Sequence, residues 1–316
     1  MKLRKAFIIG VSSTSLKKKE ISFLKKYKPW GVILFSRNIK DVQQTKRLTG
    51  QIRSCFKDSK YPILVDEEGG EVSRISKIID TRIFSSKYFG NLFQKNKNEF
   101  LQKYKVYINN ISEILKIIGI NINTVPVLDV IRKNTNKIMG SRSFSGDARI
   151  VSKLGDYCIE HYSKNRIGTV IKHIPGHGLS SKDSHISTPI INKKKKILNK
   201  IDFKAFKKKR SLFAMTAHIV YSHYDKKNPA THSKTIIGEV IRKKIKFKNL
   251  LISDDISMKA LKYDLSENAT KSLEAGCNIV LHCNGKMKEM EIVAKTVPKV
   301  DNFILKKTSQ FYNFLM

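Results

Sequence analysis

The sequence has few of the residues that staple small proteins or anchor membrane proteins. It holds only four cysteines in 316 residues, too scattered for a disulfide framework or a paired-cysteine zinc site. No apolar run reaches the roughly 18 residues that a membrane-spanning helix needs. The run Ala6–Val11 follows a basic start, but it is too short for a signal peptide and no small-x-small cleavage site follows it. We therefore expect a cytoplasmic protein without membrane contact, with reduced thiols at Cys55, Cys158, Cys277 and Cys283.

Acidic residues are scarce relative to basic ones. Lys and Arg number 62 against 26 Asp and Glu, which gives a formal charge of +36. A charge of this size favours an anionic partner such as nucleic acid. However, lysine is abundant along the whole chain, and runs such as Lys193–Lys196 and Lys207–Arg210 carry no interleaved aromatics and no RNA-binding signature. We therefore expect no specific nucleic-acid partner, although the positive field could attract substrates that carry carboxylates.

What the sequence does contain is a series of β-branched runs separated by helical patterns. Phe100–Ile118, Val151–Lys164 and Lys234–Ile245 all have apolar residues at helical spacing. Continuous apolar strands that alternate with helices predict a parallel sheet covered on both faces, and eight such units predict a (β/α)8 TIM barrel. We expect this α/β fold to form one domain over residues 1–316. The predicted strands are Ala6–Val11, Gly31–Phe35, Pro62–Asp66, Ile122–Val130, Gly168–His173, Leu212–Ile219, Asn249–Asp254 and Asn278–Cys283.

Charged residues gather at the carboxyl ends of these strands, where such barrels carry their active sites. At the end of the seventh strand, alternation allows only one of Asp254 and Asp255 to face the barrel mouth. We choose Asp254, with Asp255 as a cap for the next helix, although spacing alone equally allows two capping residues. The acidic turn that begins at Asp66 suits sugar hydroxyls or a divalent metal, and Arg74 and Arg142 are planar donors for hydroxyls or a carboxylate.

The segment from Lys172 to His185 is rich in histidine, glycine and proline, which predicts a loop after the fifth strand. Asp183 and His185 would share one face of an extended stretch, so the carboxylate could hold Nδ1–H and leave Nε2 to exchange a proton. An isolated Asp-x-His pair is more often a local surface pair. His173, His177, Asp183 and His185 also resemble a metal-ligand set, but the glycine-rich loop disfavours one, and we expect neither metal nor cofactor.

Taken together, these motifs resemble those of glycoside hydrolase family 3, in particular the cytoplasmic bacterial β-N-acetylglucosaminidases of peptidoglycan recycling. They occur in family order over residues 6–283. Glu67 departs from the family pattern, which often has glutamine there, and Glu71 stands where arginine is common. The matching motifs are Gly31–Phe35, Val65–Gly70 with Arg74, Pro126–Asp129, Arg142–Phe144, Lys172–Gly178 with Asp183–His185, Met215–His218, Pro229-Ala230, Ser253–Met258 and Glu274–Gly276.

The resemblance implies a retaining exo-β-N-acetylglucosaminidase that removes terminal β-1,4-linked N-acetylglucosamine from anhydro-muropeptide fragments. Asp254 would be the nucleophile, His185 the acid/base and Asp183 its orienting partner. We expect a monomer that takes a small carbohydrate substrate. Two alternatives stay open: a phosphorylase, since a histidine repels phosphate less than a carboxylate does, and a metal-dependent barrel hydrolase. The residues implied to bind N-acetylglucosamine are Asp66, Arg74, Arg142, Lys172 and His173.

The metal-dependent alternative gives a first prediction. We expect the chain to hydrolyse 4-nitrophenyl N-acetyl-β-D-glucosaminide at the same rate with and without a chelator, because nucleophile and acid/base are both side chains. Release of 4-nitrophenol is the measurement. A rate that collapses with chelator and returns with added zinc would instead support the metallohydrolase.

Overall fold

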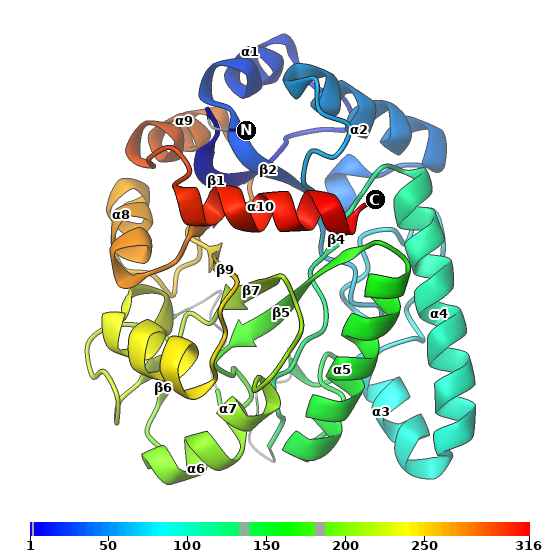
Figure 1. Cartoon of the computed structure of the whole chain (residues 1–316), viewed down its shortest axis with the longest axis vertical. Helices are drawn as coiled ribbons and strands as arrows, with labels where there is room; N and C mark the ends of the chain where they lie inside the picture. Colours follow the sequence, from blue (N-terminus) through cyan, green and yellow to red (C-terminus); the bar gives the residue numbers. More distant parts are fainter. Residues whose placement is uncertain (2, 133–134, 136–138, 181–186) are drawn as a thin grey trace.

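The computed structural model describes the whole chain except residues 2, 133–134, 136–138 and 181–186. Within this part, eight parallel strands close into a barrel in the order β1-β10-β9-β7-β5-β4-β3-β2, so the predicted (β/α)8 fold is confirmed (Figure 1). A short parallel ladder of β6 (Ile190–Ile191) and β8 (Val220–Tyr221) lies outside the barrel. The barrel strands are β1 (Lys5–Gly10), β2 (Pro29–Leu34), β3 (Ile63–Val65), β4 (Ile122–Asn123), β5 (Gly168–Ile174), β7 (Phe213–Thr216), β9 (Leu250–Asp255) and β10 (Ile279–His282).

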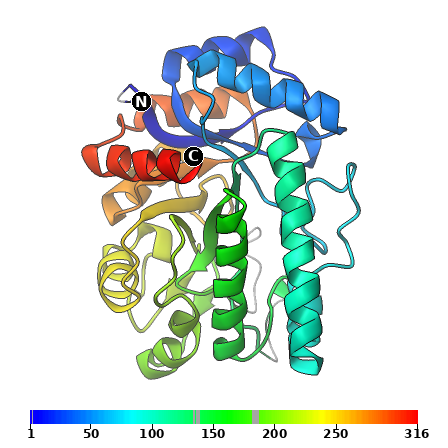
Figure 2. The same cartoon turned by 45° about the vertical axis from the view of Figure 1, so that its right-hand side comes forward.

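Helices surround the barrel, and Figure 2 shows two of them, α4 and α5, side by side along one flank. The α-helices are α1 (Lys18–Tyr27), α2 (Val42–Phe56), α3 (Ser86–Lys95), α4 (Lys97–Ile117), α5 (Ala148–Lys164), α6 (Lys195–Lys200), α7 (Asp202–Ala205), α8 (Leu265–Ala275), α9 (Met287–Thr296) and α10 (Asn302–Phe314). Outside the α-helices, the described residues also form two short 3₁₀ turns, η1 (Ser36–Asn38) and η3 (Ala230–His232), and a π-helix, η4 (Ile236–Lys244). In the described residues, no helix is both long and apolar enough to cross a membrane.

Helix α4 illustrates how the sequence produces these elements. Asn96 caps its amino end by accepting a hydrogen bond from Glu99 N at 3.1 Å. Its buried face contains Tyr104, Ile108 and Ile111, at the spacing from which a helix is predicted here. The amphipathic stripe therefore determines both the helix and the side that packs on the barrel.

The fourth strand is shorter than predicted. It covers Ile122–Asn123 rather than Ile122–Val130. Pro126 follows, and proline has no N–H to donate to a sheet ladder. Pairing with β5 resumes only as a single bridge between Val127 and Lys172. The chain beyond Asn123 is thus free of regular pairing and can place polar side chains over the barrel mouth.

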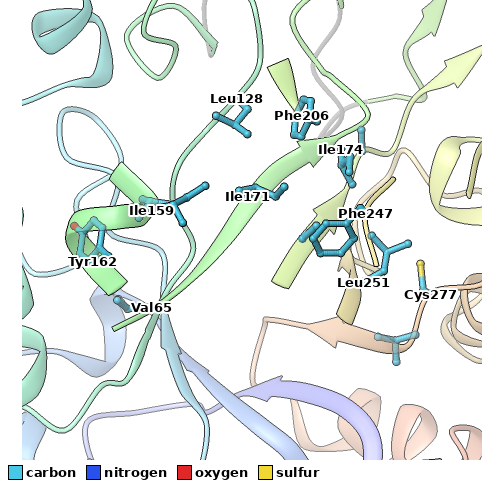
Figure 3. Close-up of a cluster of buried hydrophobic side chains, with 14 of the residues drawn as sticks. Val65, Leu128, Ile159, Tyr162, Ile171, Ile174, Phe206, Phe247, Leu251 and Cys277 are labelled. Atoms are coloured by element: carbon cyan, nitrogen blue, oxygen red, sulfur yellow. The ribbon is translucent and has the colours of Figure 1, made fainter. Parts of the chain in front are cut away.

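Alternation along the strands divides the apolar residues into two cores. One face packs inside the barrel, and the other packs against the surrounding helices; Figure 3 shows part of this outer core around Ile171 and Leu251. Inside the barrel, Trp30, Phe213 and Phe311 stack edge to face, with ring centroids 5.6 and 5.3 Å apart. Phe311 comes from α10, which lies across the barrel (Figure 1). The end of the barrel next to α10 is filled by these side chains. The opposite end, where the strands have their carboxyl ends, is therefore the accessible mouth.

The aromatic closure by α10 gives a stability prediction. Phe311 is fully buried, so Phe311→Ala should lower the free energy of unfolding by about 3–5 kcal/mol. The matched control is Phe303→Ala on the same helix, where the side chain is 37% exposed; we expect a change of no more than about 1 kcal/mol. Urea unfolding followed by fluorescence measures both. Equal losses for the two variants would show that α10 does not close the barrel core.

Candidate active site

A buried ion network occupies one side of the barrel mouth. Lys172, on β5, is 1% exposed, and its ammonium contacts carboxylate oxygens of both Asp66 and Glu68, the latter at 2.6 Å. Lys172 Nζ also donates to Thr124 Oγ1 at 3.1 Å, and Thr124 in turn donates to Asp66. The chain segments that follow β3 and β4 are thereby connected to β5 by one ammonium group.

Two arginines extend this network. Arg142 Nε and Nη2 donate to the two oxygens of Glu68 at 2.7 and 2.8 Å, a bidentate pair of fixed geometry. Arg74 Nη2 lies 3.2 Å from Asp66 Oδ2. The side chains of Asp66 and Arg74 stay 18% and 28% exposed, in contrast to the enclosed Glu68. Asp66 and Arg74 are therefore the members that a ligand in the mouth can reach.

The network favours the charged forms of its carboxylates and of Lys172. Burial alone would favour neutral carboxyls, but the charges of Lys172, Arg74 and Arg142 lower the pKa of Asp66, and those of Arg142 and Lys172 lower the pKa of Glu68. Burial likewise disfavours the Lys172 ammonium, and the carboxylates of Asp66 and Glu68 outweigh it and raise its pKa. The site thus presents fixed ionic hydrogen-bond partners, which suits recognition of sugar hydroxyls.

A second cluster forms around the fully buried Asp129. Its Oδ2 lies 2.7 Å from His173 Nδ1, and its Oδ1 accepts a hydrogen bond from His177 N at 2.6 Å. Burial opposes ionisation of Asp129, but His173 lowers its pKa. The carboxylate therefore orients the His173 ring and leaves Nε2 as the ring nitrogen available to a ligand.

The end of β9 separates its two aspartates. Leu250 and Ile252 belong to the core inside the barrel. Beyond Ile252 the pairing of β9 with β10 shifts register, so that Leu281 lies opposite Asp255, and both aspartates are half-buried. The Asp255 carboxylate is held by the following turn, where its Oδ1 accepts hydrogen bonds from Ser257 N and Oγ at 3.0 and 2.9 Å. Beside them lies the buried His218. Burial lowers the pKa of this imidazole, although the negative charge of Asp254 acts in the opposite direction. Asp255 thus stabilises the turn after β9, and the charge of Asp254 acts on His218 and Cys283 at the carboxyl end of the strand.

Four of the five predicted sugar-binding residues meet in the ion network, and His173 lies in the neighbouring cluster. Asp183 and His185 lie outside the described residues. Sequence reasoning missed Glu68, which contacts both Lys172 and Arg142. Its signal was present in the acidic turn after β3, but sequence alone does not tell which acid of the turn faces which cation.

The sequence left a metal-dependent hydrolase open as an alternative to the glycosidase. In the described part of the chain, no group of three or more His, Cys, Asp or Glu side chains is placed to hold a metal ion. Two residues of the ligand set considered above, Asp183 and His185, fall outside that part. The described residues therefore give no support for a metal site.

Comparison with known proteins adds a family match. A model described as the glycosyl hydrolase family 3 N terminal domain matches residues 4–308. A β-hexosaminidase of Methylobacillus flagellatus is 30% identical over 295 residues, which are 91% of this chain and 82% of that protein. A β-hexosaminidase of Histophilus somni is 30% identical over 300 residues, or 92% of this chain and 83% of that protein.

Solved structures agree with this match. NagZ of Neisseria gonorrhoeae, in complex with N-trifluoroacetyl-D-glucosamine, superposes with a TM-score of 0.87 at 27% identity and covers 99% of this chain and 90% of its own. A family 3 β-N-acetylglucosaminidase of Paenibacillus sp. gives a TM-score of 0.86 at 22% identity, covering 99% of this chain and 61% of its own. The second likeness concerns the fold alone.

The ion network gives a prediction on pH and stability. The pKa of Glu68 in the folded state is lowered, so its ionised form stabilises the protein above the ordinary value of 4.5, and this contribution disappears as pH falls through the folded-state pKa. Glu68→Gln leaves Lys172 and Arg142 short of a counter-charge and should lower the free energy of unfolding by about 3 kcal/mol at pH 7.

The difference between wild type and Glu68→Gln should shrink in acid, and urea unfolding between pH 7 and pH 3 measures it. Glu71→Gln is the control, because Glu71 is exposed in the same turn. A difference that is equally large at both ends of the pH range would contradict the ionic origin of the stabilisation.

Proposed function

The chain belongs to glycosyl hydrolase family 3 as a β-hexosaminidase, and we propose that it is a retaining exo-β-N-acetylglucosaminidase acting on peptidoglycan fragments. The observation that carries the proposal is the meeting of Asp66, Arg74, Arg142 and Lys172 in one ion network at the barrel mouth. These residues come from distant parts of the sequence, and each one matches a sugar-binding position of the family motif.

We propose that the terminal N-acetylglucosamine lies over the accessible edge of this network. The Asp66 carboxylate accepts hydrogen bonds from sugar hydroxyls, and Arg74 donates to sugar oxygens. Lys172 and Arg142 hold the carboxylates in place, and His173 supplies Nε2 from its orientation on Asp129. Because the network is charged before the sugar arrives, little reorganisation accompanies binding.

The reaction then proceeds in two steps. Asp254 attacks the anomeric carbon, the bond from that carbon to the leaving oxygen breaks, and His185 donates a proton to this oxygen. In the second step His185 takes a proton from water, whose oxygen attacks the anomeric carbon and releases Asp254. Two inversions give net retention, and Asp183 holds the imidazole of His185 in the tautomer that exchanges the proton.

We extend the proposal to the setting in which the enzyme works. The substrate is an N-acetylglucosaminyl anhydro-muropeptide, whose carboxylates complement the formal charge of +36. The free thiols of Cys55, Cys158, Cys277 and Cys283 fit a reducing cytoplasm. The catalytic unit is one barrel domain over residues 1–316 that works as a monomer.

The proposal predicts the behaviour of two variants in the 4-nitrophenyl N-acetyl-β-D-glucosaminide assay. Asp254→Asn and His185→Ala should each lower kcat/KM by at least about 100-fold, because each removes a covalent or proton-transfer role. Asp80→Asn and His223→Ala, at exposed positions, are the matched controls and should retain wild-type rates.

Product analysis completes this test. Hydrolysis yields free N-acetylglucosamine with β configuration first, whether or not phosphate is present, and NMR of the fresh product reads the anomer. Sugar 1-phosphate formed in phosphate buffer would establish the phosphorylase instead. A folded wild type that is inert toward the aryl glycoside and toward muropeptides would refute the proposed activity.

A further inference from the structure

Next to the ion network lies a buried carboxylate that the proposed mechanism does not use. Glu67 is 1% exposed and accepts four hydrogen bonds. Its Oε2 receives Arg74 N at 2.6 Å, Ile75 N at 3.1 Å and Ser73 Oγ at 3.2 Å. Its Oε1 receives Thr81 Oγ1 at 2.9 Å. All four donors belong to the single loop between β3 and α3, so the carboxylate gathers two separated parts of that loop around itself.

Glu67 is itself fixed to the barrel. Its backbone N–H donates to Asn123 Oδ1 at 3.0 Å, and Asn123 Nδ2 donates back to Glu67 O at 2.8 Å. Asn123 is the last residue of β4 and also donates to Tyr162 OH on α5 at 3.2 Å. Glu67 therefore joins the end of β4 through its backbone to the loop through its side chain.

The loop is also held by apolar packing, because Ile75 is fully buried in the outer core and the ring centroid of Phe84 lies 5.4 Å from that of Tyr107. Residues 73–85 contain no helix or strand. Their outer side borders an apolar cleft of 430 Å³ between the loop and α4, lined in part by Ile79, Phe84 and Val106. Close packing is incomplete where such a cleft exists. Glu67 accepts four hydrogen bonds from the loop, beside the bond from Gly70 N to Thr81 O and the ion pair of Arg74 with Asp66.

This loop carries Arg74, whose guanidinium lies beside Asp66 at the accessible edge of the site. We propose that Glu67 is a positioning residue, which fixes the Arg74 backbone and thereby places its guanidinium for the sugar. This inference rests on the proposed function, since it assigns Arg74 a contact with the substrate. Glu67 itself touches no substrate atom, and its effect passes through Arg74.

Glutamine at position 67 can keep this arrangement. Its amide oxygen accepts the two backbone N–H groups, and its NH₂ group donates to Thr81 Oγ1. The Thr81 hydroxyl then donates to Ser73 Oγ, which lies 2.8 Å away. Alanine offers no acceptor and leaves Arg74 N and Ile75 N without their partner. We therefore expect Glu67→Gln to preserve the position of Arg74 and Glu67→Ala to disturb it.

The experiment is a double-mutant cycle on the full chain with the aryl N-acetylglucosaminide as substrate. Glu67→Ala should raise KM about 10-fold while kcat falls less than about 3-fold, because ground-state sugar binding is lost rather than chemistry. Glu67→Gln should stay within about 2-fold of wild type in both constants, as should the exposed control Glu71→Ala.

Arg74→Ala provides the decisive comparison. If Glu67 acts through Arg74, the double variant Glu67→Ala/Arg74→Ala has the KM of Arg74→Ala alone. Multiplicative effects on KM, or a loss confined to kcat, would overturn the inference. Where circular dichroism shows that Glu67→Ala does not fold, Thr81→Val with Ser73→Ala replaces it in the same cycle. Wild-type turnover is measured first, so that failure of the proposed function is distinguished from failure of the cycle.

Discussion

The site depends on one buried ammonium group. Lys172 enters the barrel mouth from β5 and would destabilise the fold if it stood alone, because a charge without water or counter-charge is costly. Asp66 and Glu68 enclose it, and Arg142 balances the second carboxylate. Lys172 and Arg142 are thus compensated by two carboxylates, and Arg74 adds a third cation at the accessible edge. Segments distant in sequence are drawn together by this requirement, so stability and ligand recognition rest on the same contacts.

Three neighbouring acidic residues differ in their burial and in their partners. Asp66, Glu67 and Glu68 are consecutive in sequence, yet Asp66 reaches the mouth, Glu67 accepts hydrogen bonds from a loop, and Glu68 clasps Arg142. Opposing charges lower the pKa of Asp66 and Glu68, whereas burial raises the pKa of Glu67 and outweighs the hydrogen bonds that it accepts. Because the three side chains point in different directions, three similar carboxylates make three different sets of contacts.

At the end of β9 the Asp255 carboxylate holds a turn, and Asp254 is the residue proposed as the nucleophile. The closed end of the barrel, filled by Trp30, Phe213 and Phe311, leaves the carboxyl ends of the strands as the place for chemistry. Family membership and fold are therefore consistent with the site geometry. The dyad of Asp183 and His185, which would complete the machinery, stays a prediction because it lies outside the described residues.

Sequence by itself determined the repeating architecture, because hydrophobic periodicity is a local property of the chain. Eight consecutive strand–helix units commonly fold as a closed barrel, as they do here. The sequence also identified the charged strand ends as the place of the site, since such barrels carry their active sites at the carboxyl ends of the strands. Only the tertiary structure decided which partners they take. The contact of Lys172 with Glu68 spans 104 positions (172 − 68), and the early end of β4 follows from pairing lost at Pro126. Such pairings depend on the distance and burial that the closed barrel creates, and no local pattern encodes them.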